Sequence, residues 1–381
     1  MDQRIDPAAP DQSSGRRRIA KNIFLAVLVG LAINALLGLL VDFESILEAI
    51  RQVGLLDLAV PFACGLAVYL IDSLRFMRLF ECFCVRLSFG DALYANLIGF
   101  FFSSITPSTA GGQPFQIYQF TRLGIDSTVA TNIVFSRLMV SNLAQISIIA
   151  VVALMGDGFS IFSTAGAGGF LLGFGLAVTL LAFGLLFLVF TRPIVLGRLA
   201  LRIDRSRLGR LIGHLARDER WAEGISAWSL GLGDSFKQLW SERFGVVLLD
   251  LCLHILDQAI WAFGLYLPFR SLTGAELPFL PFLFAFNLCG LVSNFVPTPG
   301  ASGSIEASYA IVLGGLAEKS GSALSAIVVW RLGAYYLHLL LTGLVYALTR
   351  TGKNLYGSCP DGMVRRQRHR RWPLPDRSAA E

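Results

Sequence analysis

Long runs of apolar residues, separated by short polar and basic segments, make up most of this chain. A helix needs about 20 mostly apolar residues to cross a bilayer core of about 30 Å. Six runs meet this length: 22–41, 54–74, 127–155, 160–191, 244–269 and 320–349. The pattern predicts an all-α polytopic membrane protein with six full transmembrane helices.

Two further stretches, Ala92–Thr121 and Leu277–Ile305, carry no charge but are interrupted by proline and glycine. These residues break helices, because proline lacks an N–H group and glycine loses more conformational freedom than other residues on folding. We predict that each stretch is a re-entrant hairpin of two half-helices. Scored as one segment each, they raise the count of membrane segments to eight.

The distribution of Lys and Arg predicts the orientation. If each broken stretch enters and leaves on the same side, segments on the amino-terminal side carry 27 of these residues and segments on the other side carry three. Cytoplasmic loops are enriched in Lys and Arg. We therefore expect a protein of the bacterial inner (plasma) membrane with both termini in the cytoplasm.

The expected organisation is a basic amino terminus, a membrane domain and a basic cytoplasmic tail: 1–21, 22–350 and 351–381. The membrane domain divides into two halves, about 22–155 and 160–349. A basic loop at 192–243 places leucine and isoleucine near helical spacing among arginines. That pattern is typical of a helix lying on anionic headgroups.

Composition supports a lipid environment, since 54% of residues are hydrophobic and 15% are charged, against about 25% charged in soluble domains. The net charge of +6 is assigned to orientation and membrane-surface binding rather than to nucleic acid. The six cysteines lie mostly in apolar runs without a repeated ligand spacing. We therefore expect neither a metal nor a cofactor.

The two broken stretches share an order of residues. Asn96-x-x-Gly99 leads to Arg137, 41 residues after the asparagine, and Asn287-x-x-Gly290 leads to Arg331 after 44 residues. The first half begins inside and the second outside, which predicts an inverted repeat. Paired interrupted segments in such repeats point to a binding site near the midplane. The alternative is two kinked helices that only pack.

The first turn combines helix breakers with hydroxyl and amide groups: Ser104, Thr106, Pro107, Gly111, Gly112 and Gln113. We expect the second half-helix to begin near Pro114, with its free N–H groups and positive dipole end directed at the turn. An anion such as a lipid phosphate would suit this position.

The second turn contains the breakers Pro297, Pro299, Gly300 and Gly303, and it leads to Glu306 in the first turn of the next half-helix. Glu306 has two interpretations. It caps the helix end electrostatically, or it faces the cavity and takes a proton or binds a cationic headgroup. A carboxylate in an apolar setting is costly without a partner.

Arg137 and Arg331 lie about ten residues into their helices, too deep to reach water easily. Both should face protein or a cavity. Arg331 can pair with Glu306, whereas Arg137 has no obvious acidic partner in its own half and is available for a phosphate. The alternative is that the arginines bond to backbone carbonyls and tie helices together.

Asp250, His254 and Asp257 share one helix face at i, i+4 and i+7. The stripe either relays protons or forms a buried polar network. With one histidine and no convergent cysteine, a metal site is not expected. Near the cytoplasmic interface, four charged side chains are expected to pair with one another: Asp72, Arg75, Arg78 and Glu81.

Three motifs are the most specific in the chain: Asn96-Leu-Ile-Gly99 through Gly111-Gly112-Gln113-Pro114, then Arg137, then Pro297-x-Pro299-Gly300-x-x-Gly303-x-x-Glu306. With them, residues 20–350 resemble the flippase-like transmembrane region of lysylphosphatidylglycerol synthases. Ala301 stands where that family commonly has a second glycine. The resemblance implies movement of a phospholipid or polyprenyl-linked lipid between leaflets, because no lysyltransferase domain accompanies the membrane region.

We therefore expect a lipid translocator rather than an enzyme, with membrane lipids bearing an anionic headgroup or phosphate as its partners. One alternative is a membrane enzyme that modifies a lipid headgroup, with Asp250, His254 and Asp257 as acid and base. No motif places a nucleophile beside them. Another is a non-transporting subunit that anchors a lipid-synthesis enzyme, since relatives are linked to hopanoid and glycolipid pathways.

Overall fold

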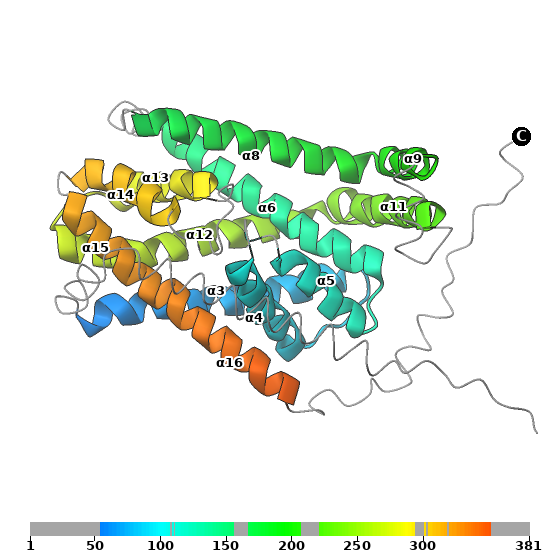
Figure 1. Cartoon of the computed structure of the whole chain (residues 1–381), viewed down its shortest axis with the longest axis horizontal. Coiled ribbons are helices and arrows are strands. Elements are labelled where there is room, and N and C mark those ends of the chain that lie inside the picture. Colours follow the sequence, from blue (N-terminus) through cyan, green and yellow to red (C-terminus); the bar gives the residue numbers. More distant parts are fainter. Residues whose placement is uncertain are drawn as a thin grey trace, which may run out of the picture.

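Helices form almost all of the chain that the computed structural model describes, which is residues 54–106, 109, 111–155, 167–206, 221–293, 301, 304–317 and 320–351 (Figure 1). The α-helices are α3 (Leu55–Glu81), α4 (Phe89–Ile105), α5 (Gly112–Arg122), α6 (Ser127–Leu154), α8 (Ala167–Thr191), α9 (Pro193–Asp204), α11 (Trp221–Lys237), α12 (Phe244–Thr273), α13 (Phe279–Ser293), α14 (Ser304–Ala317), α15 (Ser320–Arg331) and α16 (Leu337–Thr351). Two π-helical turns join them, η1 (Gln238–Glu242) before α12 and η2 (Leu332–Tyr336) between α15 and α16.

Five helices of the described chain are long and apolar enough to cross a membrane: Leu55–Glu81, Ser127–Leu154, Gly173–Thr191, Phe244–Thr273 and Ser322–Thr349. They coincide with five of the six predicted crossings, and the sixth, 22–41, lies outside the described residues. Large apolar side chains such as Leu70, Leu185 and Leu340 are exposed on them, as lipid allows and water would not. The prediction of an all-helical polytopic membrane protein is confirmed.

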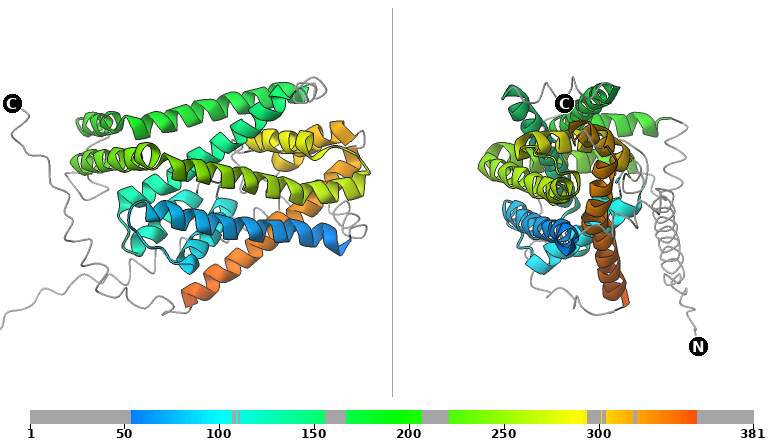
Figure 2. Two further views of the ribbon diagram at one scale, coloured as in Figure 1. Left: turned by 180° about the vertical axis from the view of Figure 1, so that it is seen from behind. Right: turned by 90° about the vertical axis from the view of Figure 1, so that its left-hand side faces the viewer.

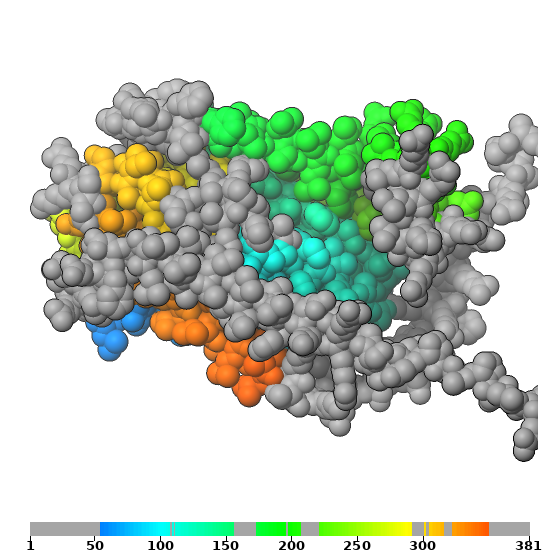
Figure 3. All heavy atoms as spheres, in the orientation of Figure 1, coloured from blue at the N-terminus to red at the C-terminus, as the bar shows by residue number. Residues whose placement is uncertain are grey.

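The central helix of the bundle is α12, which packs against α3, α6, α13 and α15. It runs roughly along the longest axis of the molecule, as α3 and α8 do (Figure 1). The space-filling view of the same face places α8 along one side and α16 along the other (Figure 3). Asp250 and Asp257 on α12 are buried among these helices and require partners there.

Both uncharged stretches form a pair of short helices with a break between them, α4–α5 and α13–α14. The first pair lies nearer the end of the molecule that carries α9 and α11, and the second pair lies toward the opposite end (Figures 1 and 2). The second helix of the first pair begins at Gly112 rather than near Pro114. The helix therefore starts two residues earlier than predicted, and Pro114 occupies its first turn, where a missing N–H is tolerated.

A left-handed residue precedes the second helix of each pair. Thr109 has φ = 53° and Ala301 has φ = 52°, and each lies three residues before the first residue of the following helix, Gly112 and Ser304. This conformation disfavours residues with a Cβ atom. Glycine would therefore suit the position that Ala301 occupies better than alanine does.

Replacing Ala301 with glycine should stabilise the folded protein by about 1 kcal/mol, because glycine adopts positive φ without the steric cost that alanine bears. Thermal unfolding in detergent measures the effect. Ala310→Gly, in the right-handed interior of α14, is the matched control and should destabilise by about 1 kcal/mol. Two shifts of the same sign would contradict the assignment of strain to position 301.

The helices α4 and α5 touch closely where they meet. Thr106 donates its hydroxyl to the carbonyl of Phe102 at 2.7 Å and accepts the N–H of Gly111 at 2.9 Å. The rings of Phe102 and Phe115 stack with centroids 3.4 Å apart. At Gly112 a Cβ atom would lie 2.6 Å from the carbonyl oxygen of Gly99. Only glycine therefore fits at the start of α5 without displacing α4.

Gly112→Ala should lower the unfolding free energy by about 1 to 3 kcal/mol, the usual range for forced overpacking. Gly184→Ala in α8 is the control, because a Cβ atom there meets nothing within 4 Å. It should be neutral or should stabilise by about 0.5–1 kcal/mol. Equal melting temperatures for the two variants would show that α5 shifts away from α4 at little cost.

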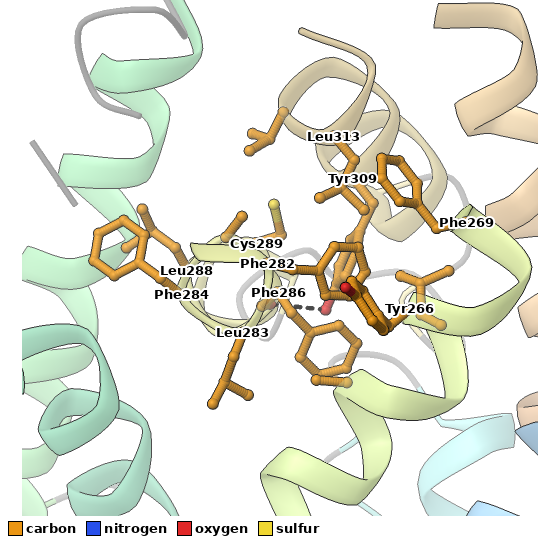
Figure 4. Packing of buried hydrophobic residues seen from close by; sticks show 14 of the residues in the cluster. Tyr266, Phe269, Phe282, Leu283, Phe284, Phe286, Leu288, Cys289, Tyr309 and Leu313 are labelled. Atoms are coloured by element: carbon orange, nitrogen blue, oxygen red, sulfur yellow. Dashed lines mark hydrogen bonds between the residues drawn. The ribbon is translucent and has the colours of Figure 1, made fainter. Parts of the chain in front are cut away.

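The largest apolar core lies between α12, α13 and α14 (Figure 4). Phe282, Phe284 and Leu288 are fully buried there, and Tyr309 donates its hydroxyl to the carbonyl of Phe286 at 3.0 Å. Every polar group of a helix end in hydrocarbon needs such a partner. This core positions α13 and α14 against the central helix.

The basic loop 192–243 contains α9, α11 and η1, and α9 packs on α11. On α9, Ile194, Val195 and Leu199 are exposed beside the exposed Arg198 and Arg202. Apolar and cationic side chains on one exposed helix are what binding to anionic headgroups requires. That location stays a prediction for α9; residues 207–220 lie outside the described chain.

Candidate functional site

A fully buried arginine, Arg75 of α3, is the centre of a polar cluster. Its Nε and Nη2 donate to the two carboxylate oxygens of Asp250 at 2.7 and 3.1 Å. Its Nη1 lies 2.7 Å from Asp72 Oδ1, 2.7 Å from Asp257 Oδ2 and 2.6 Å from His254 Nδ1. Three carboxylates and an imidazole thus surround one guanidinium.

A second arginine, Arg137 of α6, closes the cluster on another side. It forms an ion pair with Asp72 and lies 3.5 Å from the side-chain oxygen of Asn96. Its guanidinium stacks on the Phe76 ring at 3.7 Å, a favourable cation–π distance. Asn96 in turn donates to Ser73 Oγ at 3.0 Å. The cluster therefore joins α3, α4, α6 and α12.

Helical spacing explains how each helix contributes to the cluster. Asp72 and Arg75 are three residues apart on α3, and Asp250, His254 and Asp257 recur at four and three residues on α12. Residues at these spacings share a helix face. Because α3 packs along α12, the two faces meet.

The predicted pairing of charges on α3 is confirmed, and the prediction about Arg137 is wrong. Asp72 and Arg75 form an ion pair, as predicted, but Arg75 is buried and binds α12, and only Arg78 and Glu81 form an exposed pair, at 3.4 Å. Arg137 is not free for a phosphate, because Asp72, a residue of its own half, is its partner. Sequence alone did not show which way α3 turns this carboxylate.

A cavity of about 380 Å³ lies next to the cluster, between the two broken segments. Ser103, Ser104 and Thr109 line it from the first segment, and Asn287, Gly290 and Ala301 from the second. Central helices supply Gln145, Gln258, Trp261, Trp330, Arg331 and Tyr335. Gln258 also lies 3.2 Å from His254 Nε2. It therefore connects the cavity to the cluster.

Polar atoms on three cavity-lining residues have no hydrogen-bond partner among the described residues: Gln145 Oε1, Asn287 Oδ1 and Trp330 Nε1. A buried polar group without a partner costs roughly 1–3 kcal/mol. Two acceptors and one donor beside a cavity are what water or a polar ligand would satisfy.

Arg331 is the cavity's charged residue. Its Nε lies 3.1 Å from Glu306 Oε1, so the predicted ion pair forms. Its guanidinium lies 4.3 Å from the Tyr335 ring centre, and Tyr335 donates to the carbonyl of Ser104 at 3.1 Å. The π-helical turn η2 begins directly after Arg331; such turns are frequent at functional sites. The contacts with Glu306 and Tyr335 therefore hold the Arg331 guanidinium at the cavity wall.

A second hollow, an open groove of about 480 Å³ between α3 and α12, has a different character. Its lining is Ala63, Cys64, Ala67, Ala259, Ile260, Phe263 and Phe279. Such a surface offers no partner for a charged headgroup. The polar cavity, and not this groove, is therefore the candidate site for a polar ligand.

The predicted site residues separate into groups. Ser104, Asn287 and Arg331 line the cavity, Glu306 pairs with Arg331, and Asn96 and Arg137 belong to the cluster instead. Thr106, Gly111 and Gly112 shape the α4–α5 junction, and Gln113 is half-buried on α5. Outside the described residues lie Pro107, Pro297, Pro299, Gly300 and Gly303.

Asp72, His254 and Asp257 place ligand atoms within 4.8 Å of one another, close enough to hold a metal ion. Their oxygen and nitrogen atoms already converge on Arg75 Nη1 at 2.6–2.7 Å. The guanidinium thus takes the central position that a metal would need. The three side chains are therefore arranged around the Arg75 guanidinium and not around a metal position.

A family model, the lysylphosphatidylglycerol synthase TM region, matches residues 23–342. The chain belongs to this family. The match spans both broken segments, the cluster and the cavity, and it confirms the resemblance drawn from the sequence motifs. The protein is a multi-pass membrane member of this family.

A relative in Archaeoglobus fulgidus, described as a UPF0104 membrane protein, is 25% identical over 326 residues. The alignment covers 83% of this chain and 93% of the relative. The two chains are therefore similar over most of their lengths. The relative's description names a membrane protein and no substrate.

Sequence reasoning missed Arg75, Gln145 and Gln258 as site residues. Arg75 was hidden by its charged neighbours Arg78 and Glu81, which make any charge near that helix end look interfacial. A signal was present, however. Gln258 follows His254 by four residues on the stripe already identified, and Gln145 follows Arg137 by eight, which is close to two helical turns.

Proposed function

We propose that this family member is a lipid translocator in which a polar headgroup crosses through the cavity between the broken segments. The observation that carries the proposal is the lining of this cavity, where Arg331 and three unsatisfied polar atoms meet residues of both segments. Ligand pockets typically have volumes of about 300–1,000 Å³. The cavity of about 380 Å³ accommodates a headgroup, and the acyl chains stay in the bilayer.

An inverted repeat of two re-entrant hairpins fits the proposal. The α4–α5 and α13–α14 pairs lie toward opposite ends of the bundle (Figures 1 and 2). Thr109 and Ala301, both with positive φ, occupy equivalent positions before α5 and α14. Alternating access by such repeats exposes a central site to each side in turn. With basic segments inside, both termini lie in the cytoplasm of a bacterial inner membrane.

The substrate class that we propose is a phospholipid or a polyprenyl-linked lipid with a phosphate. Arg331 provides a planar donor fork, which matches phosphate oxygens, and Asn287 and Gln145 supply acceptors for hydroxyl or ammonium groups of the headgroup. Glu306 balances the arginine when no lipid is bound. Phosphate then competes with Glu306 for the guanidinium.

Movement of labelled lipid across vesicles that contain the purified protein tests the proposal. We expect transport by the wild-type protein and its loss in Gly290→Leu, because the side chain would fill the cavity that Gly290 lines. Gly315→Leu on α14, where a Cβ atom meets nothing within 4 Å, is the matched control. Wild-type vesicles that move no lipid of either class, or equal rates in both variants, would refute the proposal.

A headgroup-modifying enzyme is less well supported by the geometry. His254 is engaged through both ring nitrogens, by Arg75 at 2.6 Å and by Gln258 at 3.2 Å. Asp250 is held by two contacts with Arg75. An acid–base catalyst must reach its substrate, and Gln258 stands between these groups and the cavity.

A further inference from the structure

In the polar cluster, Arg75 Nη1 has fewer hydrogens to donate than it has acceptors around it. A guanidinium nitrogen of this type carries two hydrogens. Three acceptors approach it within 2.7 Å: Asp72 Oδ1, Asp257 Oδ2 and His254 Nδ1. Because two hydrogens face three acceptors, at least two acceptors share one hydrogen, and each of these is bonded more weakly than by a hydrogen of its own.

The net charge of the cluster indicates that it holds one bound proton. Two arginines, Arg75 and Arg137, face three carboxylates, on Asp72, Asp250 and Asp257. With every carboxylate ionised and the imidazole neutral, the cluster holds one excess negative charge. An unbalanced charge inside a membrane protein is strongly unfavourable. One bound proton makes the cluster neutral.

Asp257 is the carboxylate that this proton fits. Asp250 receives two contacts from Arg75, and Asp72 pairs with both arginines. Asp257 receives one contact from Arg75, through Oδ2, and its Oδ1 has no hydrogen-bond partner among the described residues. The residue is 1% exposed. A carboxylate so buried and so poorly bonded is the least stable ion of the three.

We propose that Asp257 holds a proton in this conformation. The proposal deepens the proposed lipid translocation, on which its coupling to transport rests. Loss of the proton leaves a negative charge beside the cavity and repels an anionic headgroup. Proton binding and anionic headgroup binding therefore strengthen each other, and linkage requires the effect to be reciprocal.

The neighbouring imidazole of His254 does not carry this proton. With Nδ1 accepting from Arg75, its hydrogen lies on Nε2, facing the Gln258 amide at 3.2 Å. The amide oxygen of Gln258 accepts that hydrogen when the amide is turned, and its orientation is assigned from such contacts. His254 Nδ1 lies 3.7 Å from Asp257 Oδ2, beyond hydrogen-bond distance, so the proton stays on the carboxyl group.

The groups that face Asp257 come from two helices besides its own. Asp72 and Arg75 approach from α3, Arg137 from α6, and Asp250 and His254 from α12 itself. Arg331 and Glu306 pair with each other beyond the cavity. Because these two charges cancel, the net charge of the cluster depends only on its own two arginines and three carboxylates.

Infrared spectroscopy of the purified protein without substrate tests the proton directly. A protonated carboxyl group shows a carbonyl stretch that an ionised carboxylate lacks. We expect this band in the wild-type protein at neutral pH, its loss in Asp257→Asn, and its retention in Glu81→Gln, which alters an exposed carboxylate of α3. The asparagine variant should fold and melt as the wild type does, because a neutral amide imitates the protonated acid.

Three results would overturn the proposal: no band in the wild type, an unchanged band in Asp257→Asn, or an Asp257→Asn protein that fails to fold. In vesicles, transport of an anionic lipid by the wild type should decrease as the pH rises, because loss of the proton leaves a negative charge beside the cavity, and the dependence should disappear in Asp257→Asn. A protein that shows the band but moves no lipid would refute translocation and leave the proton site standing.

Discussion

Replacing Arg75 with glutamine should lower the unfolding free energy by about 3 to 5 kcal/mol, the usual cost of removing one partner from a buried ion network. The substitution leaves Asp250 and Asp257 buried without the Arg75 guanidinium. It also removes the ion pairs that join α3 to α12. The measurement is thermal unfolding in detergent, with the yield of monodisperse protein as a second readout.

Arg78→Gln is the matched control, one turn along the same helix. Arg78 is exposed and pairs only with the exposed Glu81 at 3.4 Å, and such surface pairs contribute at most about 1 kcal/mol. If Arg75→Gln and Arg78→Gln destabilised the protein equally, Arg75 would not be the centre of the cluster. Combining Arg75→Gln with Asp250→Asn should recover part of the loss, because the uncompensated negative charge is then smaller.

Replacing Arg331 with glutamine should slow lipid movement by about ten- to a hundredfold. The loss of a charge-assisted hydrogen bond to phosphate accounts for roughly 1.5–3 kcal/mol, and every 1.4 kcal/mol corresponds to about tenfold. Arg331→Lys should keep part of the activity, since it retains the charge but not the planar fork. Rates of labelled-lipid transport in vesicles give the comparison.

Arg270→Gln is the control for Arg331, because Arg270 also lies over a tyrosine ring, Tyr266 at 5.7 Å, but is exposed at the end of α12. Its transport rate should match the wild type. Since Arg331→Gln also leaves Glu306 without this partner, the double variant Arg331→Gln/Glu306→Gln separates folding from function. It should fold better than the single variant and still transport lipid about ten- to a hundredfold more slowly than the wild type. Wild-type transport in the double variant would exclude Arg331 as the phosphate ligand.

The charge-free runs and their helix breakers were sufficient to predict the membrane segments. Five predicted crossings and both interrupted stretches occur where expected, because the length of an apolar helix and the positions of proline and glycine are local properties. The Asp250, His254 and Asp257 stripe was predicted from helical spacing. The Arg331–Glu306 pair was predicted because charges in apolar segments need partners.

The partners of Arg75 and Arg137 could not be predicted from the sequence. On α3, Asp72–Arg75 and Arg78–Glu81 have the same spacing, yet one pair is buried and the other exposed. The rotation of α3 against α12 decides between them, and it depends on packing between helices 175 residues apart in sequence. The same packing turns Asp72 toward Arg137 and removes that arginine from the cavity.

The sequence by itself determined that this chain crosses a membrane several times and that two of its segments break at proline and glycine. These outcomes follow from hydrophobic length and backbone conformation, which each segment carries locally. Only the tertiary structure decided which charges meet, that α12 carries both the cluster and part of the cavity wall, and that one carboxylate, on Asp257, is left poorly bonded. Such contacts depend on helix rotation and on helices that are distant in sequence, so no local pattern encodes them.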